Sequence, residues 1–273
     1  MDYNKETTIW KQCLIPQLSA FTALPFWYPA IAKCTFTEAN FVKPSFNSIY
    51  KIYFSKIFNN YKGIETFFVA QLFYPAFDIS TSKMSKVFAG NEKPNFLHEL
   101  SASICTGIWS PIVCNPLKAI MVNLQNNNIK NSYQVSKYIY NESKLNGFYR
   151  GSSYFILRNA VYAPCLLILP NHIENHLNSL SLYQNNYFNK LLSFFIPAVI
   201  ATTVSMPMDV FSTMSLTDLN KKNYKSNFDI LKTAYNSRGF KGFFSGYKWR
   251  LLATTIEFGI YNIAKKFYTS ILE

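Results

Sequence analysis

Charged residues are scarce in this chain: Asp, Glu, Lys and Arg together make up 15% of its 273 residues. Acidic residues are scarcer than basic ones, 14 against 27, which gives a formal net charge of +13. The basic residues are scattered and form no stripe or recognition helix, which argues against a nucleic-acid partner. An anionic membrane surface suits this charge better, since each nearby Lys or Arg contributes about 1 kcal/mol there.

Residues that carry enzymatic or metal chemistry are also few. The chain has five cysteines and three histidines, and no pair of cysteines has the CxxC spacing. His172 and His176 are four residues apart, but a surface pair at a helix end explains them better than a metal site. No nucleophile motif, phosphate loop or dinucleotide fingerprint is present. We therefore expect no enzyme, no cofactor and no metal site.

Three stretches lack charge altogether. Residues 12–32, 100–117 and 191–208 contain no Asp, Glu, Lys or Arg, and each is 18 to 21 residues long. At ~1.5 Å per helical residue, each is long enough to cross the hydrocarbon core of a bilayer. A proline stands near the end of each, and the intervals between these prolines are 87 and 91 residues. The prolines are Pro29, Pro116 and Pro207. A period near 90 indicates a tripled supersecondary unit.

A second landmark, two aromatic residues with a small one, recurs 35 to 41 residues after each proline. Its copies are Phe67–Ala70, Phe148–Gly151 and Phe243–Gly246. Between proline and landmark, apolar residues recur at three- and four-residue steps, which predicts a short amphipathic helix in each repeat. These helices are expected within residues 46–57, 133–139 and 228–234.

Another mostly apolar stretch follows each landmark, with charged residues inside it. These are Asp78, Arg158, Arg250 and Glu257. The pattern predicts an all-α membrane protein with six transmembrane helices, in three pseudo-repeats that together make one membrane domain. The repeats are residues 1–95, 96–185 and 186–273. Six spans would place both termini on the same side of the membrane.

The chain resembles the mitochondrial carrier family over nearly its whole length. The family motif is P-x-[DE]-x-x-[KR]-x-[KR]-x-Q, followed later by an aromatic residue, a basic residue and Gly. The second repeat keeps Pro116 and Gln125 but has Lys118 where the motif has an acid. The third keeps its proline and Asp209, and the first keeps only its proline. Phe148–Gly151 matches the second signature in full.

The resemblance implies a multi-pass protein of the mitochondrial inner membrane, with both termini toward the intermembrane space and the short helices on the matrix side. It also implies that cardiolipin binds at the ends of these helices, where glycines free backbone amides for its phosphates. The alternative is that the glycines only permit tight turns. The lipid-binding candidates are Phe68, Ala70, Tyr149, Arg150, Gly151, Phe244 and Gly246.

The gates of a transporting carrier are incomplete in this sequence. In the family, the acid of each motif pairs with the base of the next repeat and closes the matrix gate. Five of the six equivalent positions lack the expected charge, and only an unconventional pair between Lys118 and Asp209 can form. The six are Ile31, Cys34, Lys118, Met121, Asp209 and Ser212. Of the opposite gate only Tyr261 and Lys265 remain, with Asn262 for the acid. We therefore expect Asp209→Asn to have little effect.

The lost gates favour a carrier fold that no longer transports. Alternating access needs two states of similar free energy, each closed by its own contacts. Without them we expect a cavity plugged by aromatic side chains. The protein would then be an accessory subunit of a larger inner-membrane assembly, such as a respiratory complex or ATP synthase, with other subunits and cardiolipin as its partners.

A second hypothesis is a divergent solute carrier that exchanges a small carboxylate across the inner membrane. Arg158 and Asn159 lie seven and eight residues after Gly151, at the family's substrate contact point. Counting places Phe77 and, with an offset, Arg250 at the matching positions of the other repeats. Intramembrane charge marks a functional site by default. Alternatively, Arg158 pairs with Asp78 or Glu257 inside a cavity that no longer serves transport.

Overall fold

The computed structural model describes residues 3–40, 61–127, 129, 131–179, 186–221, 224 and 226–272. Every regular element among these residues is a helix, as the sequence predicts. In chain order they are α1 (Tyr3–Asn40), α4 (Ile64–Gln71), α5 (Tyr74–Ala89), α6 (Phe96–Asn126), α7 (Ser132–Phe148), α8 (Ser152–Leu167), α9 (Leu169–Ser179), α10 (Asn186–Thr217), α11 (Asn227–Arg238), the 3₁₀ helix η2 (Gly239–Phe244) and α12 (Tyr247–Leu272).

Four helices are much longer than a globular helix needs to be. α1, α6, α10 and α12 have 38, 31, 32 and 26 residues. At ~1.5 Å per residue even the last spans about 39 Å. α6 and α10 continue through prolines in their interior, among them Pro116 and Pro207. Interior prolines are tolerated in membrane helices because neighbouring groups satisfy the freed backbone carbonyls.

The other two spans are interrupted. α4 and α5 are separated at Leu72–Phe73, and α8 and α9 at Ile168. By length and composition, two stretches of the described chain qualify as membrane spans, Ser152–Ser179 and Leu191–Thr217. The count of six membrane crossings therefore stays a prediction.

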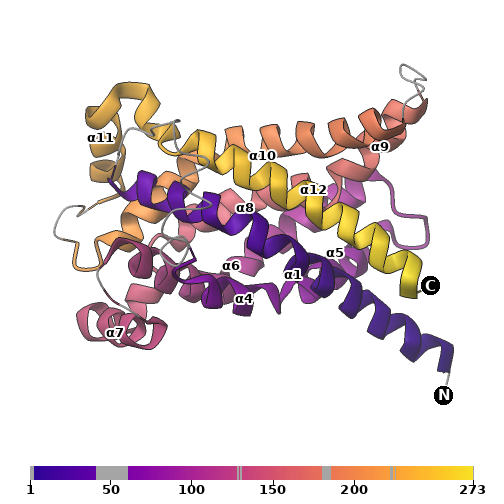
Figure 1. The fold of residues 1–273 in the computed structure, drawn as a ribbon, viewed down its shortest axis with the longest axis horizontal. Coiled ribbons are helices and arrows are strands. Elements are labelled where there is room, and N and C mark those ends of the chain that lie inside the picture. The colour runs from indigo at the N-terminus through magenta and orange to yellow at the C-terminus, as the bar shows by residue number, and fades with distance from the viewer. Residues whose placement is uncertain are drawn as a thin grey trace.

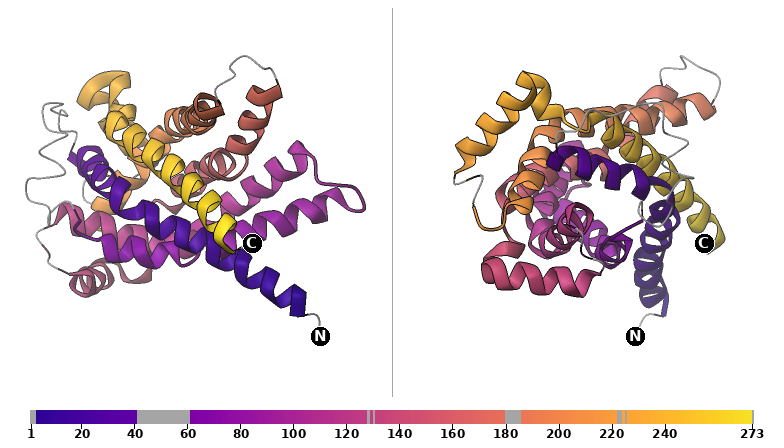
Figure 2. Two further views of the ribbon diagram at one scale, coloured as in Figure 1. Left: turned by 45° about the vertical axis from the view of Figure 1, so that its right-hand side comes forward. Right: turned by 60° about the vertical axis from the view of Figure 1, so that its left-hand side comes forward.

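The helices close into a ring. Each of α1, α5, α6, α8, α10 and α12 packs against the next in this order, and α12 packs against α1. Figures 1 and 2 show α1 and α12 running side by side, with the N- and C-terminal ends of the chain at one end of the molecule. α7 and α11 lie at the opposite end (Figure 1). Because helices of all three repeats form this ring, side chains from every repeat can meet on its axis.

The short helices of the second and third repeats begin at side-chain caps. Asn131 accepts a hydrogen bond from the Gln134 amide at the start of α7. Ser226 and Asp229 form a reciprocal capping box at the start of α11, which satisfies two backbone amides that would otherwise lack partners. The short helix expected within residues 46–57 lies outside the described residues.

Three glycines set the common register of the repeats. Gly63, Gly151 and Gly246 have φ of +86°, +70° and +87°, and they directly precede α4, α8 and α12. The landmark Phe67–Ala70 was therefore misaligned in the first repeat. Phe68 and Ala70 lie inside α4, and the equivalent of Phe148–Gly151 ends at Gly63. The left-handed backbone conformation is what these positions share, and glycine adopts it at the least cost.

Candidate functional site

A cavity of about 180 Å³ lies on the axis of the ring. Its walls come from α1, α4, α5, α6, α8, α10 and α12, so all three repeats contribute. The charged residues of its lining are three acids and three bases. They are Glu38, Lys118, Arg158, Asp209, Arg250 and Glu257. Trp27 and four other aromatic residues also line it without filling it, so the expected aromatic plug is wrong.

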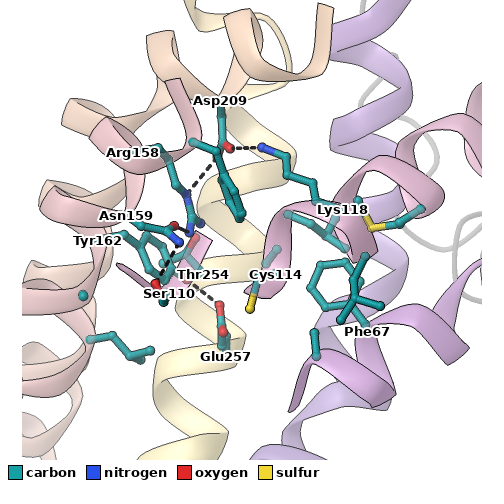
Figure 3. A pocket seen from close by; sticks show the side chains of 18 of the residues that line it. Phe67, Ser110, Cys114, Lys118, Arg158, Asn159, Tyr162, Asp209, Thr254 and Glu257 are labelled. Carbon is teal, nitrogen blue, oxygen red and sulfur yellow. Dashed lines mark hydrogen bonds and ion pairs between the residues drawn. The ribbon is translucent and has the colours of Figure 1, made fainter. Parts of the chain in front are cut away.

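Asp209 holds three cations from three different helices. Its carboxylate lies 3.1 Å from Lys118 Nζ, 3.4 Å from Arg158 Nε and 2.7 Å from Arg250 Nη2. Figure 3 shows Lys118 and Arg158 reaching Asp209 from two sides. The side chain of Asp209 is only 3% exposed. The pair between Lys118 and Asp209 that the sequence allows is present, but it is one part of a larger cluster.

The glycine register identifies equivalent positions in the cavity wall. The residues seven and eight positions after each glycine all line the cavity. They are Ala70 and Gln71, Arg158 and Asn159, and Ala253 and Thr254. Phe77 and Arg250 also line the cavity, but they are not the equivalents of Arg158. Sequence reasoning missed Gln71, which the motif Tyr61-Lys62-Gly63 of aromatic, base and glycine could have revealed.

α8 contributes a polar face to the cavity. Arg158 donates to Asn159 Oδ1 at 2.6 Å, and Asn159 donates to Ser110 Oγ at 3.4 Å. The Arg158 guanidinium lies 3.7 Å from the ring centroid of Tyr162, and the Tyr162 hydroxyl donates to Glu257. Among the groups described here, Arg158 is paired with Asp209 and Asn159 and not with Glu257. The side chain of Asp78 lies outside the described residues.

Two buried polar atoms of the cavity wall have no hydrogen-bond partner within the described structure. They are Gln71 Oε1, an acceptor, and Arg250 Nε, a donor. Gln71 is 3% exposed and Arg250 is 9% exposed. Buried polar groups in native proteins are nearly always paired, and each exception needs an explanation.

The end of the ring near α7 and α11 is closed by hydrogen bonds. Thr213 of α10 donates to Glu38 of α1 at 2.6 Å, and Asn123 of α6 donates to the Leu216 carbonyl of α10 at 3.0 Å. Asn40 of α1 donates to Asn126 of α6 at 3.0 Å. These contacts join the three helices pairwise. Neutral donors thus stand near the positions where the family motif has ion pairs, and hydrogen bonds join the helices at this end.

The other gate remnants make separate contacts within and between helices. Gln125 contacts the Tyr28 hydroxyl at 3.3 Å, and Tyr28 in turn donates to the Lys62 carbonyl at 2.8 Å. Asn262 donates to the Phe258 carbonyl of its own helix. Tyr261 is buried, and the side chain of Lys265 lies outside the described residues. No described contact joins these residues into a second gate.

The lipid-binding candidates have structural roles of their own. Arg150 donates to the carbonyls of Leu219 and Tyr224 and lies 3.5 Å from Asp218. A Cβ at Gly151 would approach Ser215 Cβ to 2.8 Å. Tyr149 donates to the Ile112 carbonyl. The starts of α8 and α12 nevertheless leave first-turn amides available to an anion, as every helix N-terminus does.

Phe244 and Gly246, the candidates of the third repeat, directly precede α12. Phe244 lies at the end of η2 and packs on the Tyr247 ring, with 6.1 Å between ring centroids. A Cβ at Gly246 would approach Cys34 Sγ to 3.0 Å. The glycines therefore serve close packing, whether or not a lipid binds beside them.

A closed ring of helices in repeated units, with a charged cavity on its axis, defines a membrane transporter fold, and the chain belongs to the mitochondrial carrier family. The profile of this family, described as Mitochondrial carrier protein, matches residues 92–180 and 183–272. The chain is similar to the mitochondrial aspartate-glutamate transporter AGC1 of Saccharomyces cerevisiae, with 24% identity over 201 residues. The similarity covers 66% of this chain and 22% of that protein.

Family membership sets the general class of the protein. Mitochondrial carrier proteins are transporters and not enzymes, and the family implies a multi-pass protein of the mitochondrial inner membrane. The chain spans about a fifth of the length of the yeast relative, so that protein's activity does not transfer with the similarity.

Proposed function

We propose that the protein is a solute carrier that moves a small carboxylate-bearing solute across the mitochondrial inner membrane. The observation that carries this proposal is the axial cavity, in which Arg158 and Arg250 both face the same space. Two guanidinium groups in a low-dielectric cavity attract a carboxylate strongly and bind it with directed hydrogen bonds. The yeast relative's name, an aspartate-glutamate transporter, agrees with this class of solute.

The buried charge supports a working cavity over a vestigial one. Charged side chains inside a membrane domain are expensive, and a cavity without a function has no use for six of them. Asp209 forms ion pairs with Lys118, Arg158 and Arg250. Its carboxylate thus takes the place that a solute carboxylate would take. An incoming carboxylate competes with Asp209 for the two arginines, which couples binding to rearrangement of α8, α10 and α12.

The hydrogen bonds at the closed end also support transport. Alternating access requires that each closed state be stabilised by contacts that are weak enough to break. The pairs Thr213–Glu38, Asn123–Leu216 and Asn40–Asn126 meet this requirement without ion pairs. A net contribution of about 1 kcal/mol for each such bond is small enough to be overcome by solute binding.

The accessory-subunit hypothesis loses its main support, since it rested on an absent gate and a plugged cavity. We keep it as the outcome that a failed transport test would restore. Other subunits of a membrane complex would then be the partners of this chain.

We further propose that cardiolipin binds at the starts of α4, α8 and α12. Gly63 replaces Phe68 and Ala70 as the landmark of the first site, because it precedes α4 as Gly151 precedes α8. The net charge of +13 supports attraction to an anionic lipid. We also infer that both termini face the intermembrane space. They lie at the end opposite α7 and α11, the helices that the family resemblance places on the matrix side.

Binding of a carboxylate is tested with purified protein in mild detergent, by the rise in melting temperature on addition of mono- and dicarboxylates. We expect a rise for at least one small carboxylate in the wild type. Arg158→Gln should abolish it, and Arg238→Gln, which removes a basic residue of α11 outside the cavity, should retain it. If no carboxylate raises the melting temperature of the wild type, the proposal is contradicted.

A further inference from the structure

We propose that Tyr61 and Tyr149 are positioning residues that hold α1 and α6 rigid at their prolines, and that α10 bends at Pro207 to open the end of the ring near α7 and α11. The inference concerns a motion of the ring, so it does not depend on the chemistry of the solute. It rests on a hydrogen bond present in two repeats and on a phenylalanine in the third, and the contacts of α10 support it.

The first repeat shows how a side chain replaces the hydrogen bond that a proline removes. Proline has no amide N–H, so the carbonyl four residues before it in a helix loses its usual donor. For Pro29 of α1 this is the carbonyl of Pro25, and the Tyr61 hydroxyl donates to it at 3.0 Å. Neighbouring groups that satisfy such carbonyls allow a membrane helix to contain proline. Tyr61 therefore stabilises α1 where its own backbone bonding is weakest.

The second repeat has the same arrangement. Pro116 frees the carbonyl of Ile112 in α6, and the Tyr149 hydroxyl donates to this carbonyl at 3.2 Å. Tyr149 stands two residues before the glycine that precedes α8, as Tyr61 stands two residues before the glycine that precedes α4. The same contact at equivalent positions of two repeats indicates that the hydroxyl has a function in the repeat unit.

The third repeat has the proline but not the hydroxyl. Pro207 frees the carbonyl of Thr203 in α10. The residue two positions before the glycine of this repeat is Phe244, whose side chain has no donor. The Tyr247 hydroxyl comes near, but its contact is with the Thr203 hydroxyl oxygen, at 2.9 Å. Among the described contacts, no side chain donates to the Thr203 carbonyl.

This difference makes α10 the most easily bent of the three helices at its proline. Sharp bends in helices occur where a proline or another group interrupts the ladder of backbone hydrogen bonds. In α1 and α6 a tyrosine restores one bond at that point, whereas α10 has a phenylalanine at the equivalent position. Motion at the closed end should therefore begin in α10.

The contacts of α10 place the effect of such a bend at the closed end. Thr213 and the carbonyl of Leu216 form hydrogen bonds with α1 and α6. Both residues follow Pro207, as does Asp209 with its three cations. The segment before Pro207 packs in a cluster with residues of α8 and α12. A bend at this proline therefore moves the closing contacts together and leaves the preceding segment in place.

α1 and α6 are joined at the same end by contacts that do not involve α10. Lys62 Nζ donates to the Asn127 carbonyl at the end of α6, at 2.9 Å. The Tyr28 hydroxyl of α1 contacts Gln125 of α6 at 3.3 Å and donates to the Lys62 carbonyl at 2.8 Å. α1 and α6 therefore stay together when α10 bends away, so the end opens on the side of α10.

Hydrogen–deuterium exchange of the purified protein in detergent, read by mass spectrometry, tests the proposal without any solute. Phe244→Tyr supplies the third hydroxyl and should slow exchange in residues 203–211 about fivefold, the change that one hydrogen bond of about 1 kcal/mol produces. It should also slow labelling of Cys34 by a small maleimide, in a variant without other cysteines, because Cys34 is buried beside Glu38 at the closed end. Phe228→Tyr, the same change at an exposed position of α11, is the control and should alter neither rate.

Tyr149→Phe tests the same bond in the opposite direction. It should speed exchange in residues 112–120 about fivefold and leave residues 203–211 unchanged. Tyr61→Phe should do the same around the proline of α1. A merely structural role of either hydroxyl would instead raise exchange throughout the chain. Tyr133→Phe, which removes an exposed hydroxyl of α7, is the matched control.

The results decide as follows. Slower exchange in residues 203–211 together with slower labelling of Cys34 in Phe244→Tyr supports the proposal, and either rate left unchanged overturns it. Exchange around Pro116 that keeps its wild-type rate in Tyr149→Phe also overturns it, and this variant decides if Phe244→Tyr does not fold. Neither measurement involves a solute, so a protein that takes up nothing in vesicles would overturn the carrier proposal alone.

Discussion

The Arg250 guanidinium lies 2.7 Å from the Asp209 carboxylate, across the interface between α12 and α10. Lys118 and Arg158 approach the same carboxylate from α6 and α8. Asp209 therefore joins four of the six helices of the ring at one point. From the sequence alone, only an unconventional pair with Lys118 was expected for this residue.

Asp209→Asn should destabilise the protein strongly, contrary to the expectation from sequence. It leaves three buried cations without their shared carboxylate, and removal of one partner from a buried ion pair costs about 3 to 5 kcal/mol. The melting temperature in detergent measures this. Ser212→Ala removes one hydrogen-bond acceptor of Lys118 and should cost less, about 1.5 to 3 kcal/mol, because Lys118 keeps its ion pair with Asp209. Equal melting temperatures for Asp209→Asn and the wild type would show that the cluster does not hold the helices together.

Thr213→Val should loosen the closed end of the ring. It removes the donor to Glu38 without a large change in volume, and a buried acceptor that loses its partner costs about 1 to 3 kcal/mol. Cys34 is fully buried beside Glu38, so its labelling rate by a small maleimide, in a variant without other cysteines, reports opening. Labelling should be faster in Thr213→Val than in Thr203→Val, a matched change at an exposed position of the same helix. Equal rates would mean that this bond does not keep the end closed.

Gly63→Ala should lower the melting temperature, whereas Gly259→Ala should not. The φ of Gly63 is +86°, and a Cβ there would lie 3.1 Å from the Tyr28 hydroxyl. The left-handed conformation alone costs a non-glycine residue about 1 to 2 kcal/mol. A Cβ at Gly259 has nothing within 4 Å, and alanine is favoured over glycine inside a helix. If Gly63→Ala has the melting temperature of the wild type, the repeat alignment that makes the three glycines equivalent is contradicted.

Lys248→Gln should weaken the stabilisation that added cardiolipin gives, measured for each protein against its own lipid-free melting temperature. Lys248 is exposed in the first turn of α12, beside the proposed lipid site. Added cardiolipin should raise the melting temperature more in the wild type and in Lys232→Gln, an exposed change on α11, than in Lys248→Gln. Gly151→Val is less informative, because its side chain would collide with Ser215 whether or not lipid binds. An equal response of all three proteins to cardiolipin would remove support for this site.

The fold was predictable because repetition amplifies weak signals. Pro116 and Pro207 each stand in a long helix as the spacing predicts, and α7 and α11 follow from apolar residues at helical steps. The register of the first repeat was harder, because Phe67–Ala70 imitates the landmark and drew attention away from Gly63. The backbone conformation at Gly63 separates the two, and in the sequence the motif Tyr61-Lys62-Gly63 was the signal that could have shown it.

The site was predictable residue by residue but not as a set of contacts. Arg158 and Asn159 were found from their spacing in sequence after Gly151, and both side chains do line the cavity. That three cations share Asp209 depends on side chains from separate helices meeting on the axis. Sequence spacing fixes a residue's face on one helix, and it does not fix which face of another helix lies opposite. Gln71 was missed for the same reason as Gly63.

The most direct test of the central claim is uptake of labelled small carboxylates and amino acids into vesicles that contain the purified protein. We predict uptake that saturates with solute concentration, that protein-free vesicles lack, and that Arg158→Gln abolishes while Arg238→Gln does not. Uptake indistinguishable from that of protein-free vesicles for every solute, from protein with a wild-type melting temperature, would contradict the claim. Comigration of the protein with a respiratory complex or ATP synthase on a native gel would then favour an accessory subunit.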